Sequence, residues 1–254
     1  MTEMIRMTLE GAVAAITIDR PEGNVLTTEI LRALTATIRS AGASEAKVIT
    51  LRSTGPDFCR GRDPKGGPAN PTTLVMRDQV LQPILDVYAA LNEAPQPVVC
   101  AVQGAALGFG CAMATACEVT IAADNATFKL PEMTHNLPPT LAISALMPKV
   151  SRKAIAWMVY AMPTLDANTA RDIGIVSAVA PAAKLDAAVK DTLATRARRR
   201  EGLSALGPDD GAARRRRLWG GIACGRADVG EALTRRDQQT PFVPAQAGTQ
   251  SFGR

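Results

Sequence analysis

A nearly all-apolar run, PVVCAVQG at residues 97–104, places the tightest limit on how this chain can fold. A strand that is apolar on both faces is typical of a parallel sheet with helices on each side. Further strands are expected at 13–18 (VAAITI) and 47–52 (KVITLR), and each is followed by apolar residues at helical spacing. Because strands and helices alternate, the predicted fold class is α/β.

The helices between these strands have recognisable beginnings. The first is expected to have Thr27 or Thr28 as its N-cap, and the second to cover 74–91, with Pro83 as the place for a kink. GFGCAMATAC is expected to turn into a helix of small residues. The elements expected after it, in chain order, are short strands in VTIAA and ATFK, a helical region at 139–160 that Pro148 interrupts, a helix ending at Gly174, a strand in IVSAVA and a helix from Pro181 to about residue 195.

Charge is distributed unevenly along the chain. Residues 196–254 contain twelve arginines, no lysine and six acidic residues, whereas the first 195 residues contain one more acidic than basic side chain. The net charge of +5 therefore belongs to the C-terminal segment and predicts no nucleic-acid partner for the rest. We predict a folded core at 1–195 and a poorly ordered Arg/Gly/Ala-rich tail at 196–254. A shifted reading frame or a basic nucleic-acid-binding tail would give this composition, and the scarcity of aromatic residues beyond Trp219 favours the first.

The cysteines bear on whether the chain binds a metal or forms disulfides, and the N-terminal segment bears on whether it enters a membrane. Five cysteines without a CxxC spacing, and a single histidine, favour neither structural zinc nor a disulfide framework, so no metal is expected. The N-terminal segment is interrupted by Glu3, Arg6 and Glu10, and the sequence has no uninterrupted apolar run of 18 residues. The expectation is a cytoplasmic protein with reduced, mostly buried thiols and no membrane partner.

Two glycine-rich stretches, DFCRGRDPKG at 57–66 and QGAALGFGCAM at 103–113, follow predicted strands directly. Glycine tolerates a positive φ and lets a ligand approach the main chain. Two such turns after separate strands can aim two backbone N–H groups at one point, which stabilising an enolate or a tetrahedral oxyanion requires. Neither stretch fits GxxxxGK[ST] or GxGxxG, so a phosphate-binding loop is not predicted.

The motifs resemble those of a known family. FCRGRD resembles the F-C-A-G-x-D loop of the crotonase superfamily, the enoyl-CoA hydratases and isomerases. The segments DRPEGNVLTTEILRAL, AVQGAALGFGCAMATACEVTIAADNATFKLPE and DANTARDIGIVSAVAP resemble further blocks of that family in the same order, over about residues 8 to 195. The resemblance implies a spiral of ββα turns, here with an atypical C-terminal region, that binds an acyl-CoA thioester as a homotrimer or hexamer. It implies no cofactor other than the coenzyme A of the substrate.

The resemblance also assigns roles to particular residues. The backbone N–H groups of Arg62 and Phe109 would form an oxyanion hole around the thioester carbonyl, and Glu132 would handle the proton. The substrate-binding candidates are Gly23, Val25, Arg60, Asp63, Lys65, Gly108, Gly110, Pro131 and His135. The side chains of Arg60, Arg62 and Lys65 would meet acidic groups of CoA, with solvated loop charge as the alternative.

Two departures from the family pattern change the expected reaction and the expected assembly. Hydratases of this family carry a glutamate at the position of Ala112, so one of the two usual carboxylates is missing. A single carboxylate can shuttle one proton between carbons, which favours double-bond isomerisation over hydration. Hydration, thioester hydrolysis and non-catalytic acyl-CoA binding remain alternatives, and His135 is a substitute acid/base or a structural residue. The tail lacks the amphipathic helices with which relatives cover the site and build the trimer, so assembly is expected to be weakened.

Overall fold

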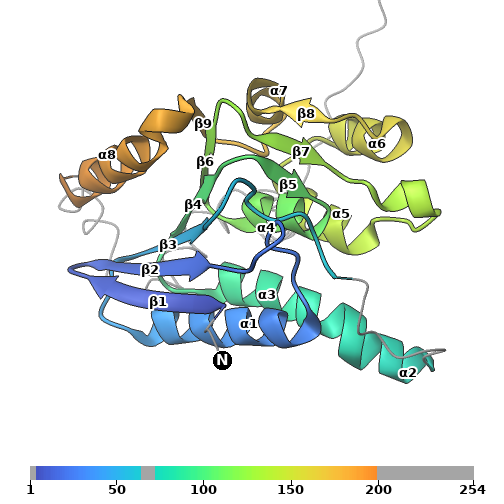
Figure 1. Cartoon of the computed structure of the whole chain (residues 1–254), viewed down its shortest axis with the longest axis horizontal. Helices are drawn as coiled ribbons and strands as arrows, with labels where there is room; N and C mark the ends of the chain where they lie inside the picture. The colour runs from blue at the N-terminus through green and yellow to red at the C-terminus, as the bar shows by residue number, and fades with distance from the viewer. Residues whose placement is uncertain (1–3, 64–71, 199–254) are drawn as a thin grey trace, which may run out of the picture. The chain divides into compact units, whose positions relative to one another are not determined.

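The computed structural model describes residues 4–63 and 72–198 (Figure 1). Lys65, Cys224 and the tail from residue 199 onward lie outside the described residues, as do the expectations attached to them. Within the described ranges, no helix is long and apolar enough to cross a membrane.

The larger sheet has six strands in the order β1-β2-β3-β4-β6-β9. β1 and β2 form an antiparallel hairpin, and every later strand pairs in parallel with its neighbour. All five residues of β4 are buried, as its continuous apolar sequence predicts. The strands are β1 (Ile5–Glu10), β2 (Val13–Ile18), β3 (Val48–Ser53), β4 (Val98–Val102), β6 (Val119–Ala123) and β9 (Ala178–Ala180).

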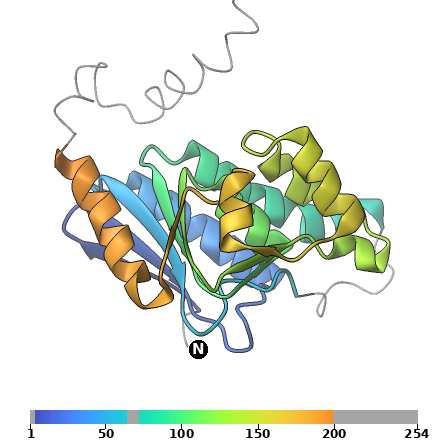
Figure 2. The same cartoon turned by 90° about the horizontal axis from the view of Figure 1, so that it is seen from above.

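Helices cover both faces of this sheet (Figures 1 and 2). Apolar side chains of α1, α3 and α4 join the main core on one face, while Leu185 of α8 packs with Val99, Ala101 and Ile121 on the other. The α-helices are α1 (Thr28–Ala43), α2 (Thr73–Met76), α3 (Gln82–Glu93), α4 (Phe109–Ala116), α5 (Thr140–Leu146), α6 (Arg152–Ala161), α7 (Ala167–Asp172) and α8 (Leu185–Arg198). Three short helices of other types are the π-helical η1 (Arg77–Leu81) and the 3-10 helices η2 (Glu132–His135) and η3 (Ala182–Lys184).

A second sheet of three strands reveals the repeating unit. It contains β5 (Ala105–Leu107), β7 (Thr127–Lys129) and β8 (Leu165–Asp166), and an isolated parallel bridge joins Cys59 to Ala106. Two successive turns of the chain each give one strand to the larger sheet, one to the smaller sheet, and then a helix: β4, β5 and α4 are followed by β6, β7 and α5. The expected spiral of ββα turns is confirmed.

Most expected elements are present, with differences that have local causes. Thr27 caps α1, its hydroxyl accepting from the Ile30 N–H. The region expected as one helix at 74–91 is divided into α2, η1 and α3, and the irregular part ends just before Pro83, the position expected for a kink. Pro83 lies in the first turn of α3, where a residue without an N–H is tolerated, and the irregular π-helical turn precedes it. α8 continues to Arg198 rather than to about residue 195.

Candidate active site

Strand pairing in the smaller sheet relates the positions of the three candidate catalytic residues. Cys59 is paired with Ala106, and Ala106 with Phe128, so these three residues occupy equivalent positions in successive turns of the spiral. Arg62 and Phe109 each lie three residues beyond such a position, and Glu132 lies four beyond. Because successive turns stack in register, these residues are expected at the same end of the smaller sheet.

The Gly61–Arg62 peptide is held in a fixed orientation. Gly61 has a φ of +109°, and its carbonyl accepts a hydrogen bond from the Leu26 N–H at 2.9 Å and one from the Cys59 thiol at 3.7 Å. In a trans peptide the N–H points opposite to the carbonyl, so these bonds also fix the direction of the Arg62 N–H. Within the part of the chain that the structure describes, that N–H has no acceptor.

The Phe109 N–H is the first of α4. Gly108 has a φ of +51°, its N–H donates to the Lys129 carbonyl at 2.9 Å, and its carbonyl accepts from the Ala112 N–H at 3.0 Å. The first N–H groups of a helix have no intrahelical acceptor and carry the positive end of the helix dipole. Across residues 4–63 and 72–198, no backbone or side-chain acceptor is bonded to the Phe109 N–H.

The turn at Cys59–Arg62 and the segment that leads into α4 are joined directly by backbone hydrogen bonds. The Cys59 N–H donates to the Ala105 carbonyl at 3.0 Å, and the Leu107 N–H donates to the Cys59 carbonyl at 2.9 Å. A Cβ on Gly110 would lie 2.2 Å from the Cys59 carbonyl oxygen, which excludes any side chain there. Gly110 therefore has a packing role: its missing side chain lets α4 begin directly against the Cys59 turn.

Glu132 begins η2 and turns its carboxyl toward this pair of turns. A Cβ on Gly108 would lie 2.8 Å from Glu132 Oε1, so the carboxyl lies against the Gly108 turn. Its Oε2 is buried without a hydrogen-bond partner. Desolvation by burial raises the pKa of this carboxyl above its ordinary value, which suits a group that takes and returns a proton.

The other carboxylates near the turns already have bonding partners, and the thiols there are buried and protonated. The carboxylate of Asp57 accepts from the Ala105 N–H at 2.9 Å, and that of Asp63 forms an ion pair with Arg20 at 2.8 Å. Burial raises the pKa of Cys59 and of Cys111 to about 12, so both thiols stay protonated near neutral pH. Within the described ranges, no cluster of His, Cys, Asp and Glu is arranged to hold a metal ion.

One aromatic residue next to the turns was not foreseen as part of the site. Tyr88 of α3 stacks on Phe109, with ring centroids 5.7 Å apart and an interplanar angle of 17°. The helical spacing of 74–91 assigned Tyr88 to the core, and its burial agrees with that. Its position against Phe109 depends on how α3 packs on α4, and no local pattern in the sequence encodes that contact.

The substrate-binding candidates Gly23 and Arg60 lie together. The Arg60 N–H donates to the Gly23 carbonyl at 2.9 Å, and a Cβ on Gly23 would lie 2.4 Å from Arg60 Cδ. Arg60 is otherwise exposed, with Nε 3.9 Å from the Asp57 carboxylate. Val25, half-buried, precedes the Leu26 that bridges to Arg62.

The remaining candidates differ in their surroundings. Arg62 has a half-buried side chain whose Nε is buried without a partner, and desolvation lowers its pKa. Asp63 is occupied by Arg20, which ties the 20–24 turn to the 60–63 loop. Pro131 precedes η2, and His135 ends η2 with an exposed side chain.

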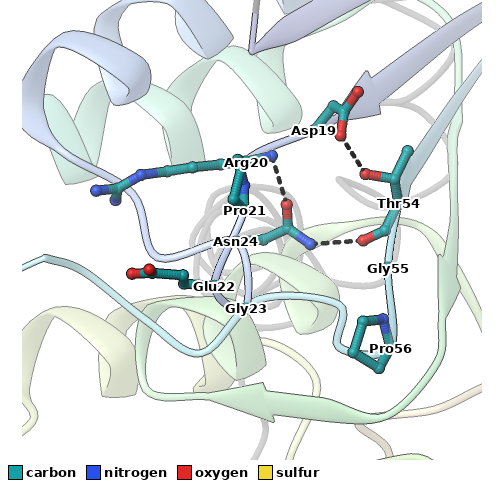
Figure 3. A pocket seen from close by; sticks show the side chains of 9 residues that line it. All are labelled: Asp19, Arg20, Pro21, Glu22, Gly23, Asn24, Thr54, Gly55 and Pro56. Atoms are coloured by element: carbon teal, nitrogen blue, oxygen red, sulfur yellow. Dashed lines mark hydrogen bonds between the residues drawn. The ribbon is translucent and has the colours of Figure 1, made fainter.

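A surface hollow of about 210 Å³ lies beside Gly23 (Figure 3). Its lining residues are Asp19, Arg20, Pro21, Glu22, Gly23, Asn24, Thr54, Gly55 and Pro56. Its polar groups bond to one another: Arg20 N–H donates to Asn24 Oδ1 at 2.9 Å, and Asn24 Nδ2 donates to the Thr54 carbonyl at 2.8 Å. Arg62, Phe109 and Glu132 do not line it, so this hollow is separate from the three candidate catalytic residues.

Comparisons with known proteins agree with this architecture. A sequence model described as "Enoyl-CoA hydratase/isomerase" matches residues 8–200. The Mycobacterium tuberculosis protein named "Probable enoyl-CoA hydratase echA6" is 32% identical over 135 residues, 53% of each chain. A Rhodobacter capsulatus protein named "Probable enoyl-CoA hydratase" is 39% identical over 127 residues, 49% of this chain and 48% of the relative. The chain thus spans about half the length of these curated relatives.

Solved structures are similar to this protein over a larger share of the chain. An enoyl-CoA hydratase from Mycobacterium smegmatis has a TM-score of 0.78 and 22% identity, over 93% of this chain and 92% of that one. An enoyl-CoA hydratase from Mycobacterium avium subsp. paratuberculosis has a TM-score of 0.70 and 27% identity, over 91% of this chain and 90% of that one.

Proposed function

The chain belongs to the enoyl-CoA hydratase/isomerase family, and from that premise we propose that it isomerises the double bond of an enoyl-CoA thioester. In this proposal the N–H groups of Arg62 and Phe109 bind the thioester oxygen, and Glu132 is the acid/base.

The observation that carries the proposal is the state of the Glu132 carboxyl. It lies against the Gly108 turn, and one oxygen is buried with no hydrogen-bond partner. Ala112, in the position where hydratases of the family carry a second glutamate, is fully buried and offers only a methyl group. One carboxyl against the Gly108 turn, together with two N–H groups that have no acceptor among the described residues, fits a reaction that moves one proton, since water addition normally uses a separate acid and base.

The proposed reaction is a proton shift through an enolate. The Glu132 carboxylate removes a proton from C2 of a 3-enoyl thioester, and the electron pair of that C–H bond delocalises onto the thioester oxygen. The Arg62 and Phe109 N–H groups stabilise this negative charge, and the dipole of α4 adds to their effect. The protonated Glu132 then returns the proton at C4, which leaves the double bond between C2 and C3.

Hydration is the second candidate, because the curated relatives carry the name enoyl-CoA hydratase. It would require a water molecule activated at the same carboxyl, with another group supplying the second proton transfer. The two reactions give different products from related substrates, so a product analysis separates them.

The test supplies a 3-enoyl-CoA and, separately, a 2-enoyl-CoA to the full chain in deuterated water. The expected result is interconversion of the two enoyl isomers with deuterium at C2 and C4, lost in Glu132→Gln and retained in Glu93→Gln. Formation of 3-hydroxyacyl-CoA as the main product would assign hydration instead. Binding of both thioesters without deuterium exchange would identify a non-catalytic acyl-CoA binder.

We also propose that the chain assembles as a homotrimer or hexamer. Three large apolar side chains of the α5–α6 region are exposed in the single chain: Met147 by 61%, Trp157 by 44% and Tyr160 by 83%. Exposed apolar groups of this size are typical of association surfaces. Sedimentation of the full chain as a monomer at micromolar concentration would contradict this proposal.

A further inference from the structure

The side chain of Arg62 is a cation without an anionic partner. Its Nε is buried without a hydrogen-bond partner, and none of the ion pairs among the described residues includes it. The two arginines of the neighbouring segments do have carboxylates beside them. Arg20 pairs with Asp63 at 2.8 Å. The Arg60 Nε lies 3.9 Å from the Asp57 carboxylate. Among these three arginines, Arg62 alone lacks a counter-charge in the described structure.

The backbone turns this side chain inward. Arg62 forms an isolated parallel bridge with Leu26, and residues paired in this way direct their side chains to the same side. Leu26 is fully buried, which accounts for the burial of the Arg62 Nε, whereas Arg60 in the same loop is exposed. Desolvation lowers the pKa of Arg62, because taking a cation out of water without a partner is unfavourable. An anion bound to the guanidinium would offset that cost.

The neighbouring parts of the chain do not supply that anion. The segment that follows the Arg62 loop, residues 64–71, reads PKGGPANP and contains neither Asp nor Glu. Glu132 forms no ion pair with Arg62, and its Oε2 is itself buried without a partner. The missing counter-charge therefore points to a bound molecule.

The position of the side chain selects the part of the substrate that it can meet. In the proposed function the Arg62 N–H binds the thioester oxygen, so the guanidinium lies within one side chain's length of that oxygen. The phosphates of coenzyme A are separated from the thioester by the whole pantetheine arm, whereas the acyl chain begins at the thioester carbonyl. A carboxylate a few carbons along the acyl chain is the anion within reach, and a guanidinium can bind it through two parallel N–H groups.

We propose that the Arg62 guanidinium is a specificity-determining group that binds a carboxylate on the acyl chain. The substrates are then CoA thioesters of short dicarboxylic acids. This inference rests on the proposed function, because it takes the Arg62 N–H as a donor to the thioester oxygen. The second carboxylate stays ionised and takes no part in the proton shift between C2 and C4.

The experiment measures, by calorimetry, the affinity of the full chain for two pairs of saturated thioesters: glutaryl-CoA with pentanoyl-CoA, and adipoyl-CoA with hexanoyl-CoA. The members of a pair have equal numbers of acyl carbons and differ only in a terminal carboxylate or methyl group. In at least one pair the carboxylate should strengthen binding about tenfold, the ratio that one hydrogen bond between charged groups gives. Arg62→Met keeps the backbone N–H and should reduce this preference to about twofold or less. Arg62→Lys keeps the charge without the planar fork and should show an intermediate preference.

The controls separate this inference from the proposed function. Arg39→Met removes the same charge from an exposed position on α1 and should keep the full preference. No preference in either pair, or a preference that Arg62→Met and Arg62→Lys retain in full, would overturn the role of Arg62 while acyl-CoA binding stands. Weaker binding of free CoA by Arg62→Met, with the preference unchanged, would assign the guanidinium to the phosphates instead. Failure of all four thioesters to bind would overturn the proposed function and this inference together.

Discussion

The paired turns and the exposed segment of this protein are packed in opposite ways. The paired turns, residues 59–62 and 104–112, are joined by backbone hydrogen bonds and include Gly110, where an added Cβ would lie 2.2 Å from the Cys59 carbonyl oxygen. The exposed segment, residues 73–81 in α2 and η1, has no buried residue, and Leu74 is 60% exposed.

The difference bears on what a thioester site requires of its backbone. Stabilising a developing negative charge needs donors that are held in place before the reaction, and the paired turns hold theirs by backbone contacts. The exposed segment is bonded to α1 by the Thr28 hydroxyl, which donates to the Gln79 carbonyl at 2.9 Å, and its π-helical turn is an irregular helix. Substitutions should therefore have large effects in the first region and small effects in the second.

The largest effect is expected from Glu132→Gln, which removes the acid/base beside the paired turns. The turnover rate should fall by roughly 10²–10⁴, because general acid–base catalysis contributes that much. The measurement is the isomerisation rate at saturating substrate, with thioester affinity measured in parallel. A variant that retains more than half of the rate would show that Glu132 transfers no proton.

The next effect concerns folding. Gly110→Ala places a Cβ against the Cys59 carbonyl and should lower the free energy of unfolding by about 1–3 kcal/mol, the usual range for overpacking. Chemical denaturation gives this value. Because the two turns must separate to admit the methyl group, catalysis should fall as well. Unchanged stability would mean that the turns can move apart easily, and the contrast with the exposed segment would disappear.

A smaller effect should appear in the pH dependence of stability. Burial raises the pKa of Glu132 in the folded protein, so folding favours its neutral form. As pH rises past the ordinary carboxyl value, ionisation in the unfolded chain lowers the free energy of unfolding, until the folded pKa is also passed. Thermal melts of the parent and Glu132→Gln should agree at pH 3.5, and the variant should melt higher at pH 8. The same difference in melting temperature between parent and variant at pH 3.5 and at pH 8 would contradict this prediction.

The smallest effect is expected in the exposed segment. Leu74→Ala should change the free energy of unfolding by no more than about 0.5 kcal/mol, as is usual for surface positions. Denaturation of this variant beside Gly110→Ala tests the contrast directly. A loss of 1.5 kcal/mol or more, roughly that of a partly buried leucine, would mean that another chain covers Leu74 in solution.

The sequence predicted those parts of the fold that have strong local signals. The all-apolar β4, the Thr27 cap and the glycines at 61, 108 and 110 each require a particular environment, and the structure provides it. The short strands β5 and β8 were not predicted, because two or three residues carry no usable periodicity. The division of 74–91 was missed because apolar spacing alone does not distinguish a π-helical turn from an α-helix.

The candidate site was predictable as motifs but not as contacts. The resemblance singled out Arg62, Phe109 and Glu132, and their roles stay proposals that the experiments above test. The Cys59 thiol on the Gly61 carbonyl and the Tyr88 ring on Phe109 were not predicted. The first contact spans two residues of one loop and depends on the local backbone conformation there. The second joins α3 to α4, and the proximity of these helices is set by tertiary packing, which leaves no pattern within either one.

The order of strands in the larger sheet bears on how the protein can be made. From β1 to β9, each strand pairs with the one that precedes it in this sheet, and β5, β7 and β8 follow the same rule in the smaller sheet. During synthesis from the N-terminus, every strand after the first of its sheet therefore leaves the ribosome when its partner strand has already been made. The hairpin of β1 and β2 can form first, and its β2 edge then pairs with β3, the first of the strands that are added in turn.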